Sequence, residues 1–132
     1  MAPFASQITF LDFEDYAAGK EFMSKVLQLE LVYDIGWAAV YGIAGKAFLG
    51  IVDRRQKSSP HKDGLLISLT TDCIEDWYAH ISSYFQVSPI EEVTDAGLKS
   101  FFFTGPEGYR FEIQQFTDGL PKGIFYETSH IL

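Results

Sequence analysis

The sequence predicts one α/β domain, or α+β if its strand order is emphasised, in which a strand–helix–three-strand module occurs twice. Three observations predict this βαβββ repeat. The order of predicted elements repeats, an aspartate precedes each predicted helix, and an Asp-x-Gly turn (Asp34–Gly36 and Asp95–Gly97) stands at the same place in each half. A length of 132 residues suits one such domain. The expected boundaries are residues 7–53 for module one, 54–64 for a linker, 65–116 for module two and 117–132 for a tail.

Module one begins with an alternating segment, residues 7–13, which is typical of a strand. One face of this strand carries Thr9, Leu11 and Phe13, and the other carries Ile8, Phe10 and Asp12. Asp15 is the expected helix N-cap, because its carboxylate can accept free backbone N–H groups. Apolar residues at helical spacing predict a helix over residues 16–27. Three strands follow, at residues 30–34, 37–43 and 47–53.

Module two repeats this order after a polar linker that contains a proline. Residues 65–71 alternate as a strand, and Asp72 with Glu75 resembles a capping box at the start of a helix over residues 74–84. Three further strands are expected at residues 89–93, 98–104 and 109–116. Pairing two such modules would cover one sheet face with helices and curve the mixed sheet into a cup on the other.

Composition excludes several classes of function. A net charge of -8 opposes binding to nucleic-acid phosphates. No basic run suggests an anionic membrane surface, and no apolar stretch approaches the length of a membrane span. The single cysteine, Cys73, excludes an internal disulfide, and we interpret it as passive, because no histidine partner stands at a recognisable spacing. The first residues lack the features of a secretory leader, so a cytoplasmic location is expected, with a cationic or neutral small molecule as a compatible partner.

Two stretches resemble the vicinal-oxygen-chelate superfamily of glyoxalase, bleomycin-resistance and dioxygenase-like proteins. Residues 15–31 (DYAAGKEFMSKVLQLEL) are similar to the family's strand-to-helix entry, with Gln28 where the family's turn has glycine. Residues 103–115 (FTGPEGYRFEIQQ) are similar to its closing hairpin, F-x-D-P-x-G-x-x-x-E, with Gly105 in place of the aspartate. The resemblance implies the two-module fold over about residues 7–116. It also implies a homodimer.

In catalytic members of this family, a metal lies on the inner face of the cupped sheet and holds two vicinal oxygens of the substrate. The resemblance carries the four ligand positions to Ile8, Gly50, Leu66 and Glu112, of which only Glu112 has a ligand atom. The three histidines fall in the linker, the second helix and the tail, at His61, His80 and His130. Because a useful transition-metal site needs about three protein ligands, we expect no metal and no other cofactor, with a divalent metal as the alternative.

Glu112 is the candidate catalytic residue, as a general acid/base or an anionic anchor, although a structural carboxylate paired with Arg110 is an equally open interpretation. Arg110 and Gln114 share its strand face. The other predicted ligand-binding residues are aromatic or acidic: Phe10, Asp12, Trp37, Tyr41, Phe48 and Phe102. Aromatic walls of this kind can stack on flat or cationic ligands.

Three functions are compatible with these residues. The first is a metal-free protein that binds a small organic molecule in an aromatic, acidic cavity, similar to the bleomycin-resistance branch. The second is a metalloenzyme with atypical ligands, either a lyase that resembles lactoylglutathione lyase (glyoxalase I) or an extradiol-type dioxygenase. The third is a metal-free isomerase or lyase in which Glu112 is the base.

Overall fold

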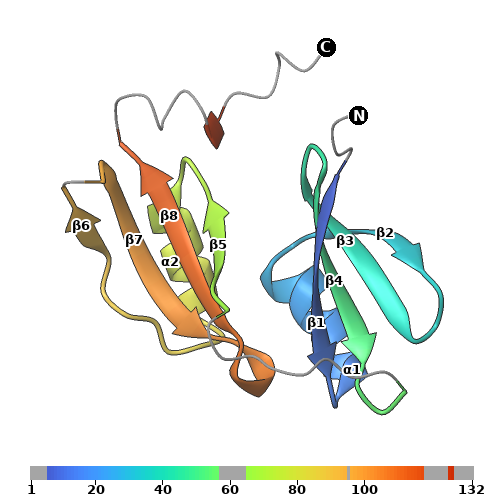
Figure 1. The fold of residues 1–132 in the computed structure, drawn as a ribbon. Coiled ribbons are helices and arrows are strands. Elements are labelled where there is room, and N and C mark those ends of the chain that lie inside the picture. The colour runs from blue at the N-terminus through green and yellow to red at the C-terminus, as the bar shows by residue number, and fades with distance from the viewer. Residues whose placement is uncertain (1–5, 57–64, 95, 118–124, 127–132) are drawn as a thin grey trace. The chain divides into compact units, whose positions relative to one another are not determined.

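The computed structural model describes residues 6–56, 65–94, 96–117 and 125–126. The chain divides into two compact units, Met1–His61 and Lys62–Leu132, and each is described by itself. Each unit contains a four-stranded mixed sheet with helix on one face (Figure 1). The predicted repeat of two βαβββ modules is therefore confirmed. Within the described residues, no helix is long and apolar enough to cross a membrane.

The first sheet has the strand order β1-β4-β3-β2. Its elements are β1 (Gln7–Phe13), α1 (Tyr16–Glu21), a π-helical turn η1 (Phe22–Val26), β2 (Glu30–Asp34), β3 (Ala38–Ala44) and β4 (Ala47–Asp53). Strand β1 runs parallel to β4, and the other pairs are antiparallel. Helix α1 packs on β1 and β4. The predicted strands agree with these bounds, except that β3 begins and ends one residue later.

Helix α1 begins where the sequence predicts, because the Asp15 carboxylate accepts a hydrogen bond from the Ala18 backbone N–H at 3.0 Å. Beneath the helix, Leu11 and Phe13 are fully buried, so this face of β1 contributes to the core. The turn after the helix contains Gln28 with φ at +57°. Glycine adopts this backbone conformation at little steric cost, which explains why the family's motif has glycine there.

The second sheet has the strand order β5-β8-β7-β6. Its elements are β5 (Ile67–Thr70), α2 (Ile74–Ser82), β6 (Glu91–Val93), β7 (Leu98–Thr104), a short 3₁₀ turn η2 (Pro106–Gly108) and β8 (Arg110–Phe116). Strands β5, β6 and β8 are shorter than predicted. The core contains stacked aromatic rings, with the Phe103 and Phe111 centroids 5.1 Å apart. Beyond β8, the Tyr126 hydroxyl accepts the Phe116 backbone N–H at 2.8 Å and donates to the Thr71 carbonyl.

The predicted capping box at the second helix is wrong. Cys73, not Asp72, is the N-cap residue, and it makes no side-chain cap hydrogen bond. The Gln115 side-chain oxygen, on β8, accepts the Ile74 backbone N–H at 2.9 Å. Glu75 instead pairs with Lys99, at 2.9 Å. The neighbouring strand thus supplies the cap, and a local sequence motif cannot reveal such a partner.

The Asp-x-Gly motif of the first unit forms a local turn. The Asp34 carboxylate accepts the Gly36 backbone N–H at 2.8 Å, and Gly36 has φ at +97°. Asp95, the matching aspartate of the second unit, lies outside the described residues, as do His61, His130, most of the linker and most of the tail.

Candidate functional site

The open face of the first sheet, opposite α1, is apolar. Strand register places Ile8 beside Phe48 and Phe10 beside Gly50 on β1 and β4. Ile8 and Phe10 are 41% and 47% exposed, whereas Leu11 and Phe13 on the other face are buried. The predicted faces of β1 are therefore the observed ones, and Phe10 and Phe48 lie together on the open face.

The Phe10 ring lies directly against the Gly50 backbone. A Cβ atom at Gly50 would be 2.5 Å from Phe10 Cε1 and 2.6 Å from Cδ1, closer than real Cβ contacts occur. Any side chain at position 50 would require the ring to move. The glycine at one of the four family ligand positions thus makes room for an aromatic ring that covers it.

The other predicted ligand-binding residues of the first unit, Asp12, Trp37 and Tyr41, do not form an acidic pocket with Phe10 and Phe48. Asp12 is 4% exposed, and its carboxylate lies 3.5 Å from the Arg54 guanidinium, which neutralises it. Tyr41 is paired with Leu49 on the helix-covered face and is 2% exposed, and burial raises the pKa of its hydroxyl. Trp37 is half-buried just before β3. The structure therefore separates Tyr41 from Phe10 and Phe48.

The open face of the second sheet is polar and centres on β8. Strand register places Glu112 between Ser68 on β5 and Phe102 on β7. The Ser68 hydroxyl donates to Glu112 Oε1 at 2.6 Å, and the Gln114 amide donates to the Thr70 hydroxyl at 3.2 Å. The alternative prediction of an Arg110–Glu112 contact has no counterpart among the described contacts, because Glu112 bonds to Ser68 instead.

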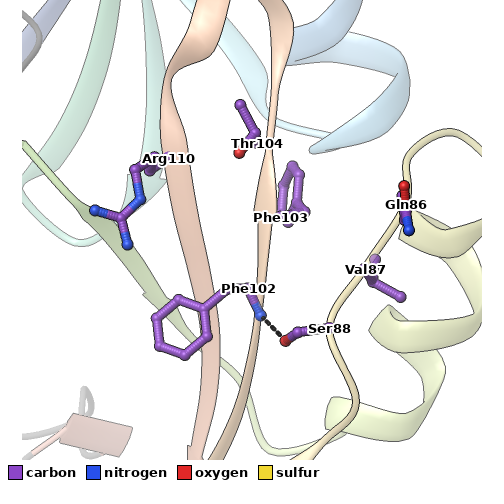
Figure 2. Close-up of a pocket in the computed structure, with 7 residues that line it drawn as sticks. All are labelled: Gln86, Val87, Ser88, Phe102, Phe103, Thr104 and Arg110. Carbon is purple, nitrogen blue, oxygen red and sulfur yellow. Dashed lines mark hydrogen bonds between the residues drawn. The ribbon is translucent and has the colours of Figure 1, made fainter.

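A hollow of about 600 Å³ borders β7 of this unit. It is lined by Gln86, Val87, Ser88, Phe102, Phe103, Thr104 and Arg110 (Figure 2). Figure 2 shows the Phe102 and Arg110 side chains projecting to the same side of β7 and β8. The hollow therefore brings together two predicted residues, Phe102 and Arg110, with several that sequence reasoning missed.

Three of the missed residues, Gln86, Val87 and Ser88, come from the loop after α2, which runs along β7. The Ser88 backbone N–H donates to the Phe102 carbonyl at 3.0 Å, and the Phe102 N–H donates to the Ser88 hydroxyl at 2.8 Å. Val87 and Phe103 form an isolated antiparallel bridge. No alternation of apolar residues marks this loop as a strand, so its pairing with β7 could not be read from the sequence.

The described residues do not fit the metal that the family resemblance implies. Ile8, Gly50 and Leu66 have no donor atom, and the Phe10 ring occupies the space over Gly50. In the part of the chain that the structure describes, no three His, Cys, Asp or Glu side chains cluster as metal ligands do. His80 lies on α2 in edge-on contact with the Trp77 and Tyr84 rings.

Several solved structures have the same fold of two βαβββ units. A lactoylglutathione lyase from Agrobacterium tumefaciens has a TM-score of 0.69 at 18% identity, over 87% of this chain and 96% of that one. TnmS3, an antibiotic-binding protein from Streptomyces sp. CB03234, has a TM-score of 0.74 at 18% identity, over 89% and 99%. The fosfomycin resistance protein FosX from Listeria monocytogenes has a TM-score of 0.65 at 10% identity, over 92% and 98%.

The sequence also matches a family model, that of the Glyoxalase/Bleomycin resistance protein/Dioxygenase superfamily, over residues 9–113. The chain belongs to this superfamily. No curated protein matches the sequence. At identities this low, the solved structures establish the fold, and the chemistry must be argued from this chain's own residues.

Proposed function

We propose that this protein binds a small organic molecule without a metal, at the open face of its second sheet. The observation that carries the proposal is the contrast between the two kinds of site. Three of the four family ligand positions lack donors, and Phe10 covers one of these three, Gly50, whereas a hollow of about 600 Å³ is lined by the exposed Phe102 and by Arg110. A concave surface with an aromatic wall and few polar groups is typical of ligand pockets.

The lyase and the antibiotic-binding protein share the fold with this chain to a similar degree, so this chain's own residues decide between the two functions. Binding a compound requires a hollow and complementary side chains, which the second unit has. A lyase or dioxygenase of the family's usual kind would require a ligand set that Ile8, Gly50 and Leu66 cannot supply. The metal-free route with Glu112 as base has less support, because Glu112 Oε1 accepts the Ser68 hydroxyl at 2.6 Å, a contact that a structural carboxylate also makes.

The experiment is a thermal-shift screen of the chelator-treated protein against cationic aromatic compounds, catechols and keto-aldehyde thiol adducts, followed by calorimetric titration. We expect ligands that raise Tm equally with and without a chelator. Phe102→Ala should weaken binding at least fivefold, since stacking on an aromatic ring contributes about 1 kcal/mol. Tyr84→Ala is the control, because Tyr84 is an exposed ring just beyond the end of α2, 52% accessible.

Metal analysis of the untreated protein separates this proposal from the metalloenzyme alternative. A stoichiometric metal whose removal abolishes binding would overturn the metal-free function. Glu112→Gln distinguishes the two roles of that carboxylate. Weaker binding with an intact fold indicates an anchor, and unchanged binding indicates a structural group that holds Ser68. We further propose a homodimer, as the resemblance implies, and light scattering at micromolar concentration tests it.

A further inference from the structure

Arg110 stands out among the cations of this acidic chain. Five lysine or arginine side chains pair with a carboxylate: Lys20, Lys25, Arg54, Arg55 and Lys99. Among the described residues, Arg110 and Lys46 make no ion pair or side-chain hydrogen bond. Lys46 lies in the turn between β3 and β4 of the first unit, whereas Arg110 lies on a sheet face and lines the hollow.

The nearest acid on the same strand does not neutralise Arg110. Glu112 stands two residues along the same face of β8, about 7 Å away by strand geometry. Its Oε1 atom accepts the Ser68 hydroxyl across the other neighbouring strand, β5. Arg110 therefore lines the hollow without an ion-pair partner among the described residues, in a chain whose net charge is -8.

Two side chains lie close enough to Arg110 on the same sheet face to contact the same ligand. Thr104 is its direct partner across β7, and Phe102 is its diagonal neighbour on the same face. Phe102 is 40% exposed, so one face of its ring is accessible. A planar guanidinium beside an accessible aromatic ring matches a planar molecule whose ring stacks on Phe102 while its acidic group bonds to Arg110.

We infer that the ligand of this site is an aromatic carboxylate, which Arg110 binds through its carboxylate and Phe102 through its ring. This inference rests on the proposed function and names the class of compound. It differs from the expectation that net charge alone suggests, namely a cationic or neutral ligand. The reason is that charges more than about 8 Å apart are screened at physiological salt, so the local guanidinium outweighs the net charge of the chain.

The test compares three probes that share one ring system: naphthoate, naphthamide and naphthylmethylammonium. Calorimetric titration at physiological salt measures each dissociation constant with the full chain. We expect naphthoate to bind about fivefold more tightly than naphthamide, since a charge-assisted hydrogen bond exceeds a neutral one by about 1 kcal/mol. The ammonium probe should bind most weakly. Naphthamide reports on the aromatic site, and the naphthoate-to-naphthamide ratio reports on the guanidinium.

Arg110→Gln should lower that ratio to about one while leaving the naphthamide affinity within twofold. Lys46→Gln is the matched control, because it removes the other unpaired described cation and changes net charge equally. It should leave the ratio unchanged. A ratio that survives Arg110→Gln, or falls equally in Lys46→Gln, overturns the inference while the proposed function stands. Tighter binding of naphthylmethylammonium than of naphthoate would also overturn the inference and leave the proposed function standing. Failure of all three probes to bind overturns the inference, and the thermal-shift screen then decides the proposed function.

Discussion

Replacing Gly50 by alanine tests whether the Phe10 ring is what restricts position 50 to glycine. The new Cβ would lie 2.5 Å from Phe10 Cε1, so the ring must leave its place. Gly50 does not have a positive φ, so alanine brings no backbone strain. Phe10 is 47% exposed, and its ring can turn toward solvent. The cost should therefore come from the displaced ring alone.

The expected change in the free energy of unfolding is the sum of two opposing contributions. Moving a side chain away from a good rotamer costs about 0.5–1.5 kcal/mol. Replacing glycine by alanine within a strand returns about 0.5–1 kcal/mol through chain entropy. Gly50→Ala should therefore lower the free energy of unfolding by at most about 1 kcal/mol. In a Phe10→Ala background, the same change should raise it by about 0.5–1 kcal/mol.

The assay is a double-mutant cycle measured by urea unfolding. We expect a coupling free energy between the two positions of about 0.5–1.5 kcal/mol, larger than the usual scatter for independent sites of about 0.3–0.5 kcal/mol. Additive effects within that scatter would refute the reasoning, because the ring would then not be what restricts position 50.

Gly19→Ala provides a contrast within the same unit. A Cβ there would lie 2.9 Å from Phe13 Cγ, but Phe13 is fully buried and its ring has nowhere to move. Overpacking costs about 1–3 kcal/mol, and helix propensity returns about 1 kcal/mol. We expect a net destabilisation of up to about 2 kcal/mol, which a smaller neighbour at position 10 does not relieve.

Three further predictions concern caps and charges. Asp15→Ala should lower the free energy of unfolding by about 0.5–2 kcal/mol, measured by urea unfolding, because α1 loses its N-cap, whereas Asp15→Asn should lose less. Tyr126→Phe should cost about 1–3 kcal/mol, because its hydroxyl satisfies two backbone groups of the second unit, and no change in unfolding midpoint would contradict that role. The Gly36 backbone N–H and the Lys20 ammonium lower the pKa of Asp34 below 3.8. Its contribution to stability is therefore complete above the unfolded-state pKa and is lost as pH falls through the folded-state value. Asp34→Asn should flatten the profile of unfolding free energy against pH below pH 3.8, measured by urea unfolding at a series of pH values.

Local signals account for the parts of the fold that the sequence predicted correctly. The cap at Asp15 acts within three residues, and the alternation of β1 separates Phe10 from Phe13 because Phe13 lies on the buried face of this strand and Phe10 on its exposed face. Strand β3 lies inside its sheet, and Ala39, Val40 and Tyr41 are all buried. Both of its faces are covered, so alternation could not reveal that Tyr41 points toward the helix.

The site was predicted only in part, for the same physical reason. Arg110 and Glu112 could be placed together because they share one face of a strand. Phe102 joins them because the closing hairpin pairs its strand with theirs. The bond from Ser68 to Glu112 and the packing of Ser88 along β7 join segments far apart in the chain. Contacts of this kind depend on strand register and loop path, which only the folded chain specifies.

The sequence by itself therefore determined the repeat, the superfamily and the loss of donors at three family ligand positions, Ile8, Gly50 and Leu66. These follow from residue identity and local periodicity. Only the tertiary structure decided that the Phe10 ring covers Gly50, and that Arg110 faces a hollow while Glu112 is held by another strand. Those outcomes depend on which side chains meet across a sheet, and strand pairing decides that.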